Sequence, residues 1–304
     1  MNTSPMPWAP SLLYATTGGR PSRRNVVVLS DGADDERAIS FAAALADARG
    51  GTLVFVNVAI RSSGTPLGLE EKVLEERRKV AQNRLRTVVD SSSGIRTRAA
   101  ARVGRTVSAI ARNVCEEFSA DVVVVAESES LLPTSLGRSV STRVGGSVDC
   151  DVVSVGGTHT SRDVSSILVP VAGGPHSGRA VDTARCLAEK HGAWVELLHV
   201  VPESGDERLL ADAERYVTAA NERLDEFEGV DEWILEADDA AEAIIDQSQY
   251  YDVTVIGAPQ KHRLREFVFG STTEDVRSSA HSTVISVERR NGRESLLSNW
   301  LRTE

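Results

Sequence analysis

An internal repeat is the feature of this sequence that most restricts its fold. Short runs rich in β-branched residues alternate with longer stretches of helical periodicity, and the same order occurs twice along the chain. Asp121 and Asp252, which open matching apolar runs, lie 131 residues apart, and Val155 and Val287, which close matching runs, lie 132 apart. The near-constant offset predicts a tandem duplication of one βαβαβαβαβ unit.

Each unit is expected to form a doubly wound, Rossmann-like α/β sheet of five parallel strands, because strands that alternate with helices pair in parallel through right-handed crossovers. We expect a flexible tail at 1–22, a first domain at 23–156, a second domain at 165–288 and a C-terminal tail at 289–304. The expected strands are 25–30, 52–59, 95–103, 121–125 and 151–155, then 167–171, 194–201, 233–236, 253–256 and 283–287, with helices at 34–48, 69–89, 107–118, 139–148, 179–191, 207–227, 240–250 and 272–280.

The charge balance and the apolar runs exclude several classes of function. A formal net charge of −10 argues against binding to nucleic acid or to an anionic membrane surface. No apolar run approaches the roughly 20 residues of a membrane span. The N-terminal stretch lacks the basic start and apolar core of a secretion signal, so a cytoplasmic protein is expected. The three cysteines and six histidines show no ligand spacing, so no structural metal is expected.

The stretch 252–272 is the best candidate for a ligand site. Val253 to Ile256 has the composition of a strand buried on both faces, Gly257 ends it, and Gly270-Ser271-Thr272 stands where a helix should begin. Free backbone N–H groups and the positive end of the helix dipole would face an anion there. From this stretch alone, an ordinary surface loop with glycine at its turns is the simpler interpretation.

With the repeat in view, the chain resembles tandem, UspA-like universal stress proteins over roughly residues 25–156 and 165–288. ATP-binding members carry Gly-x2-Gly-x9-Gly-Ser/Thr after the fourth strand, and here Gly257, Gln260 in place of the second glycine, and Gly270-Ser271 keep its length. The resemblance implies a strand order of 3-2-1-4-5 and a nucleotide site in the second domain. The residues implied for binding are Pro170, Val171, Ala172, Gly173, Val200, Ile256, Gly257, Gln260, Gly270, Ser271 and Thr272.

The two domains depart from the family pattern in complementary ways. In the second domain, Ala172 replaces the family's Asp after the first strand, while the pair His199-Val200 matches the family's second strand. In the first domain Asp31 stands at the place of that acid, but Glu127 and Glu129 replace the glycine loop and would repel a triphosphate. The first domain is therefore expected to be a structural or partner-binding repeat, with Asp31 a weaker candidate that a turn or helix cap also explains.

Further weaker candidates flank the second-domain loop. His176 and Ser177 lie at a helix start after the turn Ala172-Gly-Gly-Pro, and Lys261, Arg263 and Arg265 could neutralise a polyphosphate between the two glycines. The expected ligand is ATP or another adenine nucleotide, with or without Mg²⁺. The sequence contains no Walker loop and no nucleophile elbow, so no enzyme activity is expected beyond slow, regulatory ATP hydrolysis.

An interaction module without a nucleotide is the alternative hypothesis. The turn Ala172-Gly-Gly-Pro-His resembles stress-protein domains appended to amino-acid transporters, which implies a transporter or another protein as partner. A small-molecule sensor is a third option. The family's fifth strand is an edge strand, so we expect 151–155 to pair with 283–287 and form an internal pseudo-dimer. Whether two chains then form a homodimer is left open.

Overall fold

A computed structural model describes residues 25–30, 35–61, 67–88, 94–126, 140–157, 164–173, 175–205, 207–258, 275–277 and 279–288. The first domain contains β1 (Asn25–Ser30), α1 (Glu36–Ala48), β2 (Thr52–Ile60), α2 (Leu67–Val88), β3 (Arg96–Gly104), α3 (Val107–Glu117), β4 (Ala120–Ala126), α4 (Val140–Gly145) and β5 (Asp151–Gly157). The second contains β6 (Ser166–Pro170), α5 (Pro175–His191), β7 (Trp194–Val201), α6 (Glu207–Leu224), β8 (Val230–Glu236), α7 (Ala240–Ser248), β9 (Val253–Gly257) and β10 (Thr283–Glu288).

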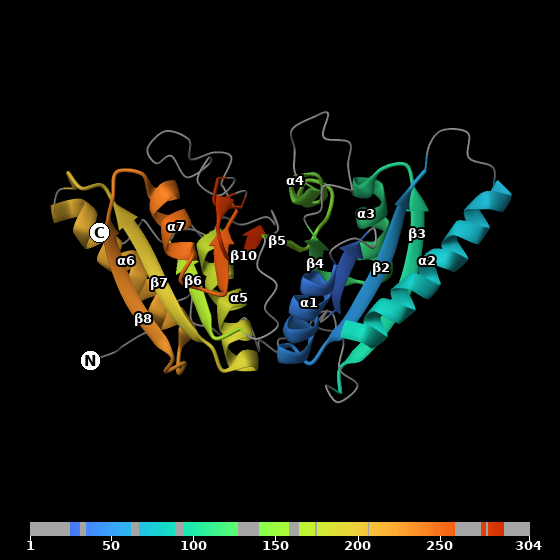
Figure 1. Ribbon diagram of the computed structural model, residues 1–304, viewed down its shortest axis with the longest axis horizontal. Coiled ribbons are helices and arrows are strands. Elements are labelled where there is room, and N and C mark those ends of the chain that lie inside the picture. Colours follow the sequence, from blue (N-terminus) through green and yellow to red (C-terminus); the bar gives the residue numbers. More distant parts are fainter. Residues whose placement is uncertain are drawn as a thin grey trace, which may run out of the picture.

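The strands form one continuous ten-stranded sheet in the order β3-β2-β1-β4-β5-β10-β9-β6-β7-β8. All neighbours within a domain are parallel, and the central pair β5 and β10 is antiparallel, with Val155 opposite Ile285. Figure 1 shows the two domains meeting along these two strands. The predicted strand order of 3-2-1-4-5 and the internal pseudo-dimer are therefore both confirmed.

Helices cover both faces of the sheet. Alternate residues of β1 point to opposite sides: Val26 and Val28 pack in a core with α1 and α2, whereas Val27 and Leu29 pack with α3 and α4. The first of these cores continues into the second domain under α5 and α6, and α7 covers a separate core on the other side. One apolar layer thus runs through both domains.

Polar contacts reinforce the junction between the domains. Lys190 of α5 pairs with Asp47 of α1 at 2.6 Å, and Arg179 of α5 lies 3.3 Å from Asp151 of β5. The Nη1 of Arg37 donates to the carbonyl oxygen of Gly157 over 2.5 Å. These contacts tie α5 and α1 to each other and to the central strand pair, so the two domains form one body.

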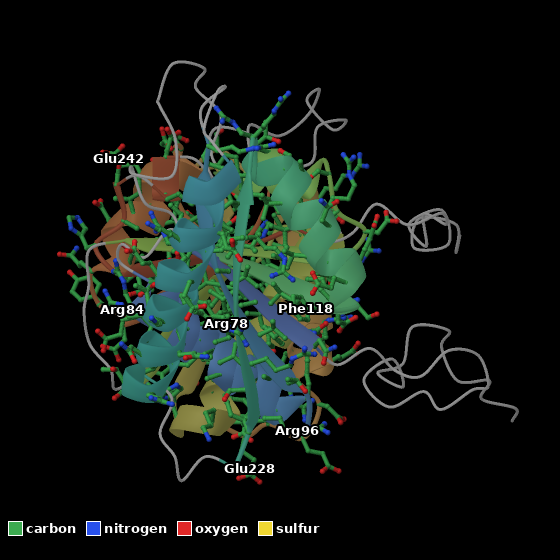
Figure 2. The ribbon with its side chains drawn as sticks, turned by 90° about the vertical axis from the view of Figure 1, so that its right-hand side faces the viewer. Arg78, Arg84, Arg96, Phe118, Glu228 and Glu242 are labelled. Atoms are coloured by element: carbon green, nitrogen blue, oxygen red, sulfur yellow. The ribbon has the colours of Figure 1, made fainter. Side chains whose placement is uncertain are left out.

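The outermost strands carry exposed charges. β3 presents Arg96 and Arg98, and β8 presents Asp231 and Glu232. Figure 2 looks onto the β3 side, where Arg96 and Phe118 are labelled; the Phe118 ring lies 5.1 Å from the guanidinium of Arg98. Charged side chains oppose the addition of a further strand to an open sheet.

Several expected element boundaries are corrected. α5 begins at Pro175 rather than 179, and β8 begins at Val230 rather than 233. α4 is shorter than the expected 139–148. Of the helices in the described part of the chain, none combines the length and apolar character needed to cross a membrane.

Candidate functional site

The carboxyl ends of β6, β7 and β9 form what we call the second-domain edge. β6 pairs in parallel with β7 on one side and with β9 on the other, so the three strands end together. Doubly wound sheets bind ligands at such a point, where successive connections leave in opposite directions. The structure brings the predicted residues Val171, Ala172, Gly173, Val200 and Gly257 to this edge.

The turn that follows β6 is closed by its own hydrogen bonds. The N–H of Val171 donates to a carbonyl of β7 over 2.8 Å, and that of Ala172 donates to the Oγ of Ser177 over 3.1 Å. Gly173 has a φ of +75°, and a Cβ there would lie 2.6 Å from Cε1 of Tyr216. The turn therefore needs glycine both for its backbone conformation and for its packing under α6.

Gly257, the last residue of β9, is pressed against the first turn of α5. A Cβ at this position would lie 2.8 Å from the carbonyl carbon of His176 and 2.9 Å from the N of Ser177. Both atoms belong to the backbone, so no side-chain rotation can relieve the contact. The structure thus gives Gly257 a packing role between strand and helix, and its predicted approach to a phosphate stays a prediction.

A buried histidine lies beside this turn. His199 of β7 is 9% exposed, and its Nδ1 lies 2.5 Å from the carbonyl oxygen of Val171. Because that oxygen only accepts, Nδ1 carries the proton and Nε2 of the neutral ring is an acceptor. Burial lowers the pKa of His199, although the hydrogen bond to Val171 opposes the shift. The ring of Tyr216 packs against the imidazole, with centroids 5.4 Å apart.

The predicted residues divide between the two faces of the sheet. Val171 packs in the core under α5 and α6, whereas Ile256 and Val200 pack in the core under α7. Pro170 ends β6 and is buried. Only 4% of Ile256 is exposed, so it can offer a ligand little besides its backbone.

The remaining candidates lie outside the described residues. They are Asp31 of the first domain, and Gln260, Lys261, Arg263, Arg265, Gly270, Ser271 and Thr272 of the second. Their roles stay predictions. Within the described ranges, no three His, Cys, Asp or Glu side chains gather as a metal site would require.

The equivalent first-domain edge, at the carboxyl ends of β1, β2 and β4, holds a buried polar cluster. Asp35, the N-cap residue of α1, accepts a hydrogen bond from the Oγ of Ser30 over 3.0 Å and lies 3.5 Å from Nε of Arg84. The Nη1 of Arg77 donates to Oδ1 of Asn57 over 3.1 Å. Both arginines come from α2, and Arg84 is labelled on that helix in Figure 2. The guanidinium groups of Arg77 and Arg84 thus contact polar side chains at this edge.

A comparison with protein families places the chain. The model of the universal stress protein family matches residues 22–156 and matches again at 164–288. The chain belongs to the universal stress protein family. Both edges described above are therefore carboxyl edges of universal stress protein domains, one polar and internally paired, the other built from backbone, glycine and aromatic rings.

Two solved structures that match most of the chain agree with this fold, and a third is similar to part of it. A universal stress protein from Archaeoglobus fulgidus DSM 4304 superposes with a TM-score of 0.61 at 15% identity, over 88% of this chain and 97% of that one. A functionally unknown protein from Pseudomonas aeruginosa PAO1 gives 0.54 at 16%, over 88% and 93%. A shorter Archaeoglobus fulgidus universal stress protein in complex with dAMP gives 0.35 at 22%, over 40% and 97%. No curated protein sequence matches the chain.

Two features of the second-domain edge were not predicted. His199 was noted only as the neighbour of Val200, and its hydrogen bond to Val171 gives it a role of its own. Tyr216 lies on an amphipathic helix with no surrounding motif, so the sequence contains no signal for its position over Gly173. The roles of both residues arise from contacts between segments that are far apart in the sequence.

Proposed function

We propose that this universal stress protein is a cytoplasmic stress-response regulator that binds an adenine nucleotide at the second-domain edge without efficient catalysis. The observation that carries the proposal is the chemistry of that edge. Backbone, glycine, the Tyr216 ring and a neutral imidazole meet there, whereas guanidinium groups of the chain reach the equivalent first-domain edge.

An adenosine moiety matches these groups. Its amine and hydroxyls are donors for the Nε2 acceptor of His199, and its flat base suits an aromatic wall such as Tyr216. The sequence places Lys261, Arg263 and Arg265, followed by Gly270-Ser271, on the loop that continues from β9, where phosphates would follow. ATP is the form of nucleotide that would use this basic loop most fully, with Mg²⁺ sharing its charge.

Thermal unfolding with ATP, ADP and AMP, each with and without Mg²⁺, tests the proposal. Ligand at about 100 times its Kd stabilises the folded state by about 2.7 kcal/mol. Gly270→Asp should remove the shift by placing a carboxylate at the phosphate loop, while the first-domain change Asp31→Ala should leave it intact. No shift at millimolar concentrations of any of the three nucleotides would contradict nucleotide binding.

One observation favours the second candidate, a nucleotide-free module that regulates a transporter or another protein. The turn after β6 is closed by the hydrogen bond from Ala172 to Ser177, and Tyr216 already covers Gly173. Such a module would show no nucleotide-dependent shift of its unfolding temperature in the same titration. The unsubstituted protein and Gly270→Asp would then behave alike.

A further inference from the structure

Two cysteine sulfurs of the first domain lie in contact. Cys115 is in α3, Cys150 directly precedes β5, and their Sγ atoms are 3.7 Å apart. The two residues are 7% and 6% exposed. They lie 35 positions apart in the sequence and on the first domain, so the pair is independent of the second-domain edge and of any nucleotide.

Hydrogen bonds join α3, which carries Cys115, to the segment that precedes Cys150. Ser108 of α3 donates through Oγ to the carbonyl of Arg143 over 3.2 Å, and Nε of Arg112, also of α3, donates to the carbonyl of Ser147 over 3.3 Å. The N–H and the hydroxyl of Ser147 both donate to the carbonyl of Val144, each over 2.8 Å. The segment that leads to Cys150 is thus fixed against α3.

The separation is short enough for a covalent bond. A disulfide has a sulfur–sulfur length of about 2.05 Å, so each sulfur needs to move by about 0.8 Å. A rotation of the two side chains is the movement that the bond requires. The third cysteine, Cys186, lies on α5 in the second domain and is not part of this pair.

We propose that Cys115 and Cys150 form a modification site that hydrogen peroxide oxidises to a reversible intramolecular disulfide. The Cys115 sulfur attacks one oxygen of the peroxide, the O–O bond breaks, and a sulfenic acid forms while the departing hydroxide takes the Cys115 thiol proton and leaves as water. The sulfur of Cys150 then attacks the Cys115 sulfur, the S–O bond breaks, and a second water leaves with the Cys150 proton. Two thiols and one peroxide give one disulfide and two waters, with two electrons passing from sulfur to oxygen.

The direction of the thiol–thiol contact assigns the two roles. Cys150 donates its S–H to the sulfur of Cys115, and this bond together with burial raises the pKa of Cys150. Cys150 is therefore the thiol that keeps its proton, and Cys115, which accepts that bond, is the sulfur that attacks the peroxide. Because the second thiol is already in contact, the sulfenic acid condenses with it before a second peroxide can produce a sulfinic acid.

Burial also selects the oxidant. A small peroxide can reach sulfurs that are only a few per cent exposed, whereas a bulky disulfide such as oxidised glutathione has no access for the in-line approach that exchange requires. The bond would fix the end of α3 to the start of β5. The next residue, Asp151, pairs with Arg179 of the second domain, so the cross-link lies at the domain junction.

Peptide mapping of the full-length protein tests the proposal. The reduced chain is exposed to hydrogen peroxide under native conditions, denatured and alkylated, and analysed by mass spectrometry. We expect one alkylated thiol, Cys186, and a peptide cross-linked through Cys115 and Cys150 that dithiothreitol releases. Oxidised glutathione should not form this bond. Three alkylated thiols after peroxide treatment, sulfinic or sulfonic acid at either residue, or a cross-link that includes Cys186 would overturn the proposal.

Variants and thermal unfolding give a second, independent measurement. Cys186→Ser should still form the bond. Cys115→Ser should retain two alkylated thiols, whereas Cys150→Ser should form no cross-link and should carry a sulfenic or sulfinic acid at Cys115. A cross-link over 35 positions restricts the unfolded chain, so the oxidised protein should unfold at a higher temperature than the reduced protein. Mapping of the unsubstituted chain decides the question even if a serine variant fails to fold.

Discussion

The two carboxyl edges of this sheet occupy equivalent positions but differ in chemistry. Ser30 lies opposite Asn57 in the pairing of β1 with β2, and the pairing of β6 with β7 ends at Pro170 opposite Leu198, directly before Val171 and His199. At the first edge Asn57 is bonded to a guanidinium from α2, while at the second His199 is bonded to a backbone carbonyl and packs against an aromatic ring of α6.

The difference shows where a duplicated fold is free to diverge. The strand interiors keep the same β-branched composition in both domains because each is covered by helices on both faces. Residues at strand ends contact loops and the next helix instead, so substitution there changes the chemistry of the edge without disturbing the sheet. The predictions below test this difference between strand interiors and strand ends.

The largest expected effect concerns Gly257, whose first-domain equivalent is Ala126. Gly257→Ala would place a methyl group 2.8 Å from the α5 backbone, and we expect a loss of about 2–3 kcal/mol in the free energy of unfolding. Denaturant unfolding measures it. The matched control is Gly178→Ala in α5 itself. A Cβ at Gly178 would lie 3.4 Å from its nearest neighbours, which are side-chain atoms of Arg223.

Gly178→Ala should stabilise the protein by about 0.5–1 kcal/mol, since alanine replaces glycine within a helix without a clash. Opposite signs for the two substitutions would confirm that the second domain needs glycine at the end of β9 for packing. Equal stability of Gly257→Ala and the unsubstituted protein would show that α5 can shift to accept a methyl group. The second domain would then not need glycine where the first domain has Ala126.

A smaller effect is expected for the polar cluster of the first-domain edge. Arg77→Met removes the donor to Asn57 and leaves a fully buried amide without that partner, which costs about 1–2 kcal/mol. Arg78→Met, the exposed neighbour on α2 labelled in Figure 2, should change stability by less than about 0.5 kcal/mol. Neither variant should alter a nucleotide-dependent shift. A weaker shift in Arg77→Met would place the nucleotide in the first domain.

Much of the fold could be predicted because its signals are local. The apolar runs locate strands such as Val253–Gly257. The pairing of the two fifth strands is not a local signal, and it was predicted from the family resemblance, in which the fifth strand is an edge strand. β8 was placed three residues late because its first residues include Asp231 and Glu232. Such charges are tolerated on an outermost strand but do not resemble a buried one.

The candidate site was harder to predict because its contacts join distant segments. Whether Gly257 faces a ligand or α5 depends on the position of His176, and no sequence pattern specifies that distance. The contact between Arg77 and Asn57 likewise joins α2 to β2 across a loop. The sequence motifs indicated which edge of the sheet could bind a ligand. The role of each residue at that edge depends on its packing, which the motifs do not specify.

The smallest expected effect is on pH dependence and concerns His199. Its pKa in the folded protein lies below the ordinary value of 6.5 because the ring is buried. Above pH 6.5 the imidazole is neutral in both states; below it the unfolded chain takes up a proton that the folded domain excludes. Stability should therefore fall as the pH decreases from 6.5 through the folded pKa. His199→Asn, which introduces the first-domain residue, should flatten this dependence in denaturant unfolding measured across that range. An unchanged slope would show that the second-domain edge accepts a charged imidazole, and the two edges would then differ less in their tolerance of charge than their contacts indicate.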